Sequence, residues 1–347
     1  MLLSMYQDSK GIFWFGSWCD GMCKYDPAET FPTGAKKFTY YNTTNGVPGK
    51  KIIEFNSRKV PRGNAVRNIQ EDPAQNIIFT TLSGVTKFDG KRFTQIHTVG
   101  KKEELSQSLG YVNGDWTREH KSLWYGNIST NGVYKFENDT LRQFTFPEPI
   151  EYSSGFDSQY AMYSHTRDSY GNLWFGTEAG GVMRYNKEGL TCINQDAEKG
   201  IVRCIFQDAT GLVWISNVLE GVYTYDYAAM RRGEEPFTCF TKKMGFHTLS
   251  EVRNKNLDKV KMFDSVQSIA QEDSGVMWFG TFGNGLWRYD ARQSPDLAFE
   301  HFTKGNGIAS NTVKSILKDK NGQLWFGIGE DLAHVYHYDE KEFKRID

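Results

Sequence analysis

Apolar and polar positions along the chain recur in blocks, and each block predicts four short strands. The first strand carries apolar residues three apart ahead of an acid, as with Val202 and Ile205 before Asp208. An Asp-x-x-Gly turn follows, in which Asp at the first position and Gly at the fourth suit a type I turn followed by a left-handed residue, a tight hairpin connection. The second strand carries adjacent bulky residues such as Trp174 and Phe175, which point to opposite faces. Both faces are therefore predicted to be buried, as in a sheet packed between two others.

Seven such blocks follow one another without a remainder for a second domain. Four strands per block of about 40–45 residues, repeated with aromatic motifs, are typical of a β-propeller. We predict an all-β fold, a seven-bladed β-propeller with four antiparallel strands per blade, as a single domain over residues 1–347. The first block begins with its first strand and the last ends with its fourth, which predicts closure by packing without strand exchange. The blocks begin near Leu2, Val66, Val112, Met162, Val202, Val266 and Val313.

Composition supports a repeat protein and excludes several function classes. The chain has 347 residues, more than the roughly 250–300 of a single compact core. That limit does not apply to repeat proteins, because each repeat buries its apolar surface against its neighbours. The formal net charge of −1 gives no whole-protein attraction to nucleic acid or anionic membranes. No apolar run approaches the roughly 18–20 residues of a membrane span, and the first residues do not form a signal peptide. Five cysteines, an odd number, do not make a disulfide framework.

Candidate ligand contacts lie on the loops after the second strands and at one shared position on the first strands. Aromatic rings mixed with amides and carboxylates suit sugar-like ligands, because rings stack while polar groups bind hydroxyls. For each residue taken singly, the alternative is an ordinary polar turn residue. The ligand-binding candidates are Trp18, Asp20, Arg67, Asn127, Glu178, Arg203, Asn217, Glu220, Phe282, Asn284 and Glu330.

Basic residues gather in the two longest connections between blocks, residues 42–64 and 242–263. Arg67, Arg203 and Lys314 also share one position on the first strands. This distribution favours an anionic ligand or partner, and the alternative is solvated charge on loops. No cluster has zinc, EF-hand or catalytic spacing, so no catalytic residue, metal or cofactor is predicted. His165, which replaces an aliphatic residue of other first strands, is read as a hydrogen-bonded structural histidine or a residue lining the channel.

The repeat resembles that of the two-component regulator propeller family. The resemblance is carried by Asp168-x-x-Gly171-x-Leu-Trp174-Phe-Gly-Thr and by the following Gly-Val-Met-Arg184-Tyr185. It extends over nearly the whole chain, and it is most specific in the fourth, sixth and seventh blocks. It implies a periplasmic or extracellular sensor domain for which oligosaccharides are among the signals.

We therefore predict a non-catalytic, ligand-binding sensory propeller for a small polar ligand or an oligosaccharide, without nucleic-acid binding. One alternative is a protein-interaction scaffold that uses the loop face and the basic connections. The other is a metal-assisted lyase, because residues 174–178 resemble the Trp-Phe-Thr-Glu repeats of propeller lyases with Gly176 inserted.

Overall fold

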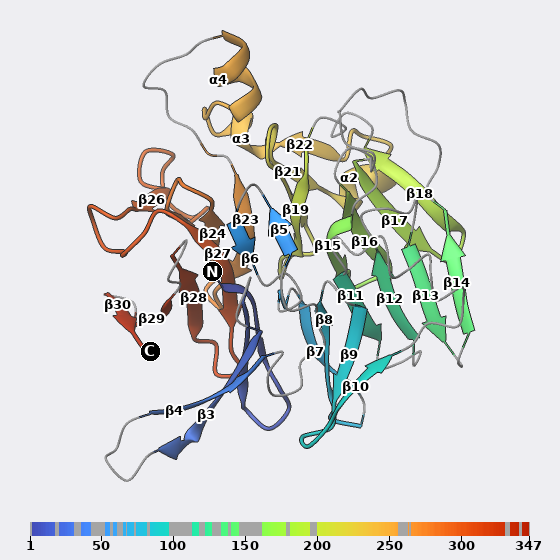
Figure 1. Ribbon diagram of the computed structural model, residues 1–347. Coiled ribbons are helices and arrows are strands. Elements are labelled where there is room, and N and C mark those ends of the chain that lie inside the picture. Colours follow the sequence, from blue (N-terminus) through green and yellow to red (C-terminus); the bar gives the residue numbers. More distant parts are fainter. Residues whose placement is uncertain are drawn as a thin grey trace. The chain divides into compact units, whose positions relative to one another are not determined.

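Seven four-stranded sheets account for most of the described chain in the computed structural model (Figure 1). The chain divides into two compact units, one of Met1–Thr145, Asp331–His334 and Ile346–Asp347, the other of Phe146–Glu330 and Val335–Arg345. We call the second of these the C-terminal unit. The structure describes residues 2–17, 21–30, 36–42, 53–55, 58–60, 65–66, 68–72, 74–81, 84–96, 113–117, 122–126, 133–137, 140–145, 162–177, 181–194, 200–255, 263, 265–329, 334–339 and 342–346.

The first three sheets belong to the first of the two units, which we call the N-terminal unit. The first contains β1 (Leu2–Gln7), β2 (Phe13–Ser17), β3 (Met22–Thr30) and β4 (Lys36–Tyr41). The second contains β7 (Asn68–Glu71), β8 (Ile77–Thr81), β9 (Gly84–Phe88) and β10 (Phe93–Ile96). The third contains β11 (Asn113–Thr117), β12 (Ser122–Gly126), β13 (Val133–Glu137) and β14 (Thr140–Phe144).

The other four sheets belong to the C-terminal unit. The fourth contains β15 (Met162–Arg167), β16 (Leu173–Thr177), β17 (Val182–Asn186) and β18 (Gly189–Asn194). The fifth contains β19 (Val202–Gln207), β20 (Val213–Asn217), β21 (Gly221–Tyr225) and β22 (Phe237–Cys239). The sixth contains β23 (Val266–Gln271), β24 (Met277–Thr281), β25 (Leu286–Tyr289) and β26 (Phe299–Phe302). The seventh contains β27 (Val313–Lys318), β28 (Leu324–Ile328), β29 (His334–Tyr338) and β30 (Phe343–Arg345).

Each sheet is a simple meander in which consecutive strands are neighbours, as the repeat predicts. The predicted all-β, four-strand unit is thus confirmed, and the arrangement is that of a propeller blade. Each sheet has two distinct ends. We call the end with the acid-x-x-Gly turn between the first two strands the turn end. We call the opposite end, where the second strand connects to the third, the loop end.

Three connections contain elements that the sequence did not predict. A two-stranded hairpin of β5 (Ile53–Phe55) and β6 (Arg58–Val60) lies in the first long insert. The fifth sheet is accompanied by the helices α2 (Tyr227–Arg231), α3 (Phe240–Lys243) and α4 (Leu249–Lys255), of which α3 and α4 are drawn in yellow-orange in Figure 1. The sequence predicted no helix in the fifth block or in the connection after it.

The start of α4 has a signal that was legible in the sequence. Thr248 accepts a hydrogen bond from the backbone N–H of Glu251 at 3.2 Å. The Glu251 carboxylate accepts one in return from the Thr248 N–H at 3.1 Å. This reciprocal pair is a capping box, which fixes the first turn of a helix. The Thr248 N–H also holds the pKa of Glu251 below its usual value, because it stabilises the charged carboxylate.

The acid of each turn stabilises both the turn and the strand that follows. One carboxylate oxygen of Asp168 accepts bonds from the backbone N–H groups of Tyr170 and Asn172, at 3.0 and 2.8 Å. The other oxygen accepts the indole N–H of Trp174 at 2.8 Å. Gly171 takes the left-handed conformation that the turn requires, with φ of 85°. The same acid-to-indole bond recurs at Asp8–Trp14, Asp208–Trp214, Glu272–Trp278 and Asp319–Trp325.

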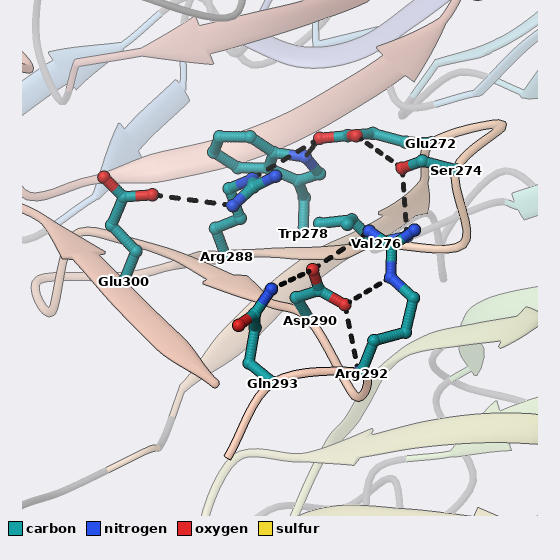
Figure 2. A network of polar contacts seen from close by, with 9 residues as sticks. All are labelled: Glu272, Ser274, Val276, Trp278, Arg288, Asp290, Arg292, Gln293 and Glu300. Carbon is teal, nitrogen blue, oxygen red and sulfur yellow. Dashed lines mark hydrogen bonds and ion pairs between the residues drawn. The ribbon is translucent and has the colours of Figure 1, made fainter. Parts of the chain in front are cut away.

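In the sixth sheet this turn extends into a larger polar network (Figure 2). Glu272 replaces the aspartate, and it binds the Trp278 indole at 2.6 Å and the Ser274 hydroxyl at 2.7 Å. Arg288 lies between two acids, 3.6 Å from Glu272 and 3.7 Å from Glu300. Glu272 thus makes the same bond to the tryptophan indole that an aspartate makes in the other sheets.

Neighbouring sheets are also joined at their turn ends. The amide oxygen of Gln207, the last residue of β19, accepts the backbone N–H of Ser169 in the preceding turn at 2.6 Å. Its amide nitrogen donates to the Gly211 carbonyl of its own turn at 3.0 Å. Gln271 repeats both bonds with Ala209 and Gly275. The last position of a first strand therefore ties two consecutive turns together.

The glycine of the Trp-Phe-Gly motif allows neighbouring sheets to approach closely. A Cβ on Gly280 would lie 2.6 Å from the Ser268 hydroxyl and 2.6 Å from the backbone oxygen of Val313 in the next sheet. Since the Val313 oxygen is a backbone atom, a side chain at Gly280 would require the neighbouring sheet to shift. The fifth sheet has Ser216 in this place, opposite Cys204, and the Ser216 hydroxyl accepts the Cys204 N–H at 2.9 Å.

The core lies between successive sheets, as the paired bulky residues predict. Trp174 and Phe175 are both fully buried although they lie on opposite faces of β16. One cluster joins the fifth and sixth sheets through Trp214, Val222, Phe240, Phe246, Phe263, Val266, Ile269, Met277, Phe279 and Trp287. Two of these, Phe240 and Phe246, come from α3 and the residues after it, so the helical insert is anchored in that core.

Candidate functional site

The loop end of the C-terminal unit contains the described candidates for ligand binding. The first strands β15, β19, β23 and β27 are successive neighbours, and each begins at this end. The second residues of these strands form a row: Tyr163, Arg203, Gln267 and Lys314. All four are partly exposed.

Two cations of this row each lie over an aromatic ring. The Arg203 guanidinium is 4.2 Å from the centre of the Tyr163 ring on the preceding first strand. The Lys314 ammonium is 4.5 Å from the centre of the Phe282 ring, which follows β24 of the preceding sheet. Such contacts orient the cation over the negative face of the ring. The shared position of Arg203 and Lys314 therefore produces the same kind of contact in two sheets.

The loop of residues 281–285 displays Phe282, whose side chain is 48% exposed although it is a large hydrophobic. Thr281 is fully buried, and its hydroxyl donates to the Gly285 carbonyl at 2.7 Å and accepts the Asn284 N–H at 3.1 Å. The Asn284 carbonyl in turn lies 2.8 Å from Nε2 of His301. The loop is thus held by its own bonds while Phe282 faces outward.

The equivalent loop of the fifth sheet is arranged differently. Asn217 is 1% exposed, and its side-chain oxygen accepts the backbone N–H groups of Leu219 and Glu220 at 2.9 and 3.0 Å. Its amide oxygen therefore stabilises the loop. Glu220 is partly exposed, and its backbone carbonyl accepts the Cys239 thiol at 3.8 Å. Burial raises the pKa of the Cys239 thiol, which remains protonated and able to donate at neutral pH.

The structure brings together only some of the predicted site residues. Arg203, Asn217, Glu220, Phe282 and Asn284 all lie at or near the loop end of the C-terminal unit. Their role in binding a ligand stays a prediction. The other candidates lie outside the described residues; they are Trp18, Asp20, Arg67, Asn127, Glu178 and Glu330.

Four residues that sequence reasoning missed take part in this site. Tyr163 and Gln267 occupy the repeat position of Arg203 and Lys314, and aligning the blocks could have found them. Ser265 has a left-handed backbone with φ of 51°, and His301 stacks on Trp287 with ring centres 3.7 Å apart. These last two depend on three-dimensional packing and leave no repeat signal.

The described residues contain no group of three or more His, Cys, Asp or Glu side chains that could hold a metal ion. Among them there is also no helix with the length and apolar character needed to cross a bilayer. His165 lies on β15 opposite Phe175 and is partly buried, and it has an interaction partner.

Comparison with known families gives a specific match at the seventh sheet. Residues 307–329 match the family described as "Two component regulator propeller". They include β27, the turn at Asp319 and β28, so the matched segment is the strand-turn-strand unit described above.

A relative and several solved structures extend this comparison. Histidine kinase P4 of Formosa agariphila is 25% identical over 171 residues, which are 46% of this chain and 11% of that protein. The chain thus matches only a small part of that relative's length. Virginiamycin B lyase from Staphylococcus aureus matches with a TM-score of 0.56 at 14% identity, over 82% of this chain and 84% of the other. A streptogramin B lyase matches with a TM-score of 0.57 at 13% identity, over 94% and 89%.

The meander sheets and these structural similarities define an all-β protein of the propeller class. At such low identity the lyases share the fold, and this similarity shows nothing further. The repeat is more specific than the fold, since its acid, turn glycine and tryptophan recur along the chain and match the family at the seventh sheet. Residues 307–329 thus resemble one repeat of the two component regulator propeller family.

Proposed function

We propose that this protein is the ligand-binding, sensory propeller of a two-component-type signalling system. The observation that carries the proposal is the match of residues 307–329 to the two component regulator propeller repeat. The name of the partly matching relative, a histidine kinase, points to the same kind of system. The protein would act outside the cytoplasm and recognise a small polar molecule or an oligosaccharide.

The loop end of the C-terminal unit supports this function chemically. It combines an exposed ring, Phe282, with the cations Arg203 and Lys314 and with the amide of Gln267. Rings pack against the apolar faces of sugars, while amides and cations bind hydroxyls and acidic groups. Scaffolds commonly carry binding residues on the loops at one end, which agrees with this placement.

An oligosaccharide array with neutral, carboxylated and sulfated members tests the proposal, with calorimetry on each positive. The expected result is saturable binding of at least one class, weakened by Phe282→Ala. Tyr170→Ala is the matched control, because Tyr170 is 53% exposed but lies at the turn end. Failure of every member to bind, or equal loss from both variants, would overturn the proposal.

A further inference from the structure

We propose that Phe282, Lys314 and Gln267 form a subsite for an anionic sugar residue, a pyranose that carries a carboxylate or a sulfate. This inference rests on the proposed function and specifies its ligand class. The exposed ring would pack against the apolar face of the pyranose. The ammonium would bind the acidic group, and the amide would bind a hydroxyl.

The geometry supplies a ring and a cation at one place. The Lys314 ammonium lies 4.5 Å from the centre of the Phe282 ring, while the ring keeps 48% of its surface exposed. Lys314 comes from β27 and Phe282 from the loop after β24, two segments of neighbouring sheets. A sugar packed against the Phe282 ring would therefore lie close enough to the Lys314 ammonium for an acidic substituent to bind it.

The backbone next to the subsite is strained at Ser265. Ser265 adopts φ of 51°, a conformation that costs a non-glycine residue energy. Its carbonyl accepts the Phe282 N–H at 3.0 Å and the Gln267 side-chain amide at 3.1 Å. One strained residue thus positions two members of the subsite, and such strain concentrates where binding residues must be held in place.

Further bonds fix the other side of the loop. The Gly285 N–H donates to the Asn311 carbonyl at 2.7 Å, and the Asn311 side chain accepts the Lys304 N–H at 2.7 Å. The loop that carries Phe282 is therefore tied to the connection that precedes β27. A preorganised loop loses little entropy when a ligand binds.

Local charge favours an anion over a neutral sugar. Residues 281–285 and 303–316, which form these two connections and the start of β27, contain two lysines and no acidic residue. The whole chain has a formal net charge of −1, so this is a local feature. A carboxylate or a sulfate would be attracted here, and added salt would weaken the attraction.

The test compares anionic and neutralised ligands on two lysine variants. Carboxylated array hits are methyl-esterified and sulfated hits are desulfated, which removes the charge and keeps the sugar. Calorimetry then measures both forms against wild type, Lys314→Gln and Lys320→Gln. Lys320 is the matched control, because it lies in the turn at the opposite end of the same strand.

We expect the anionic form to bind wild type about tenfold more tightly than the neutralised form, as a charge-assisted contact predicts. Lys314→Gln should remove this preference and Lys320→Gln should keep it. If oligosaccharides bind but the preference is absent, or survives in Lys314→Gln, the anionic subsite is overturned and the sensory function stands. If no oligosaccharide binds, both are overturned.

Discussion

In the C-terminal unit, the turn ends of the sheets share one arrangement, whereas the loop ends differ from sheet to sheet. At the turn ends one arrangement is repeated: an acid closes the turn and binds a tryptophan indole, at Asp168, Asp208, Glu272 and Asp319. At the loop ends neighbouring copies differ. Asn217 is buried and bonds its own loop, whereas Phe282 at the corresponding connection is exposed beside a lysine.

This difference separates the residues that hold the fold from those available for recognition. The turn-end acids satisfy buried donors, and an unsatisfied buried donor is costly, so little variation is tolerated there. The loop ends need only close their own hydrogen bonds. Different loop sequences can close these hydrogen bonds, so the remaining side chains of the loops are available to bind a ligand.

The largest expected effect comes from breaking a turn-end acid. Asp168→Ala removes the acceptor for the Trp174 indole, the Tyr227 hydroxyl and two backbone N–H groups, in a place where Asp168 is 4% exposed. Stranding several buried donors should lower the free energy of unfolding by about 3–5 kcal/mol. Urea denaturation followed by tryptophan fluorescence measures it.

Asp273→Ala is the control for this prediction. It removes the same charge at the turn end of the sixth sheet, two sheets further along the chain, but Asp273 is largely exposed and its bond to Lys318 is a surface ion pair. Such pairs contribute little, so its stability should stay close to wild type. Equal losses in both variants would show that the turn-end acids act through charge alone.

The sequence was informative about the turn ends because their chemistry repeats. The recurrence of acid, glycine and tryptophan predicted the turns, the double burial of Trp174 and Phe175 and the four-strand sheets, and the structure shows all of these. The acid-to-indole bond was not predicted. It requires a side chain to reach six residues along the chain, across the turn.

The loop ends were less predictable because each copy is unique there. The sequence named Phe282 and Asn217 together as ligand candidates, and only the fold separates an exposed ring from a buried amide. The helices that accompany the fifth sheet were missed for a similar reason. Their apolar residues Phe240 and Phe246 pack into a cluster made by two sheets, which a local pattern cannot reveal.

A smaller effect should come from Tyr227, which reinforces one turn end alone. Its hydroxyl donates to Asp168 and accepts from Asn172 at 2.9 Å. Burial, followed by the bond and charge of Asp168, raises the pKa of Tyr227 well above 10.0. The neutral phenol is thus favoured in the folded state. Its contribution to stability is fully present below pH 10 and is lost as the pH rises from there toward the folded-state pKa.

Tyr227→Phe isolates this contribution. The variant should lose about 1–2 kcal/mol of unfolding free energy at neutral pH, because a hydrogen bond to a carboxylate is removed. The gap from wild type should then narrow when unfolding is measured between pH 10 and 11. A gap that stayed constant over that range would show that ionisation of Tyr227 does not limit stability.

The smallest effect, and the sharpest comparison of the two ends, comes from Gln75 at a turn end and Ser265 at a loop end. Among the residues that the structure describes, these two have left-handed backbones without being glycine. Replacing either with glycine relieves strain of about 1–2 kcal/mol and adds an entropy cost of about half that, so each variant should gain about 0.5–1 kcal/mol. Binding should distinguish them. The Ser265 carbonyl holds Phe282 and Gln267, so the more flexible Ser265→Gly should bind anionic oligosaccharides less tightly while Gln75→Gly binds as wild type does. If both variants are stabilised and neither changes affinity, strain at the loop end has the same purely structural role as strain at the turn end.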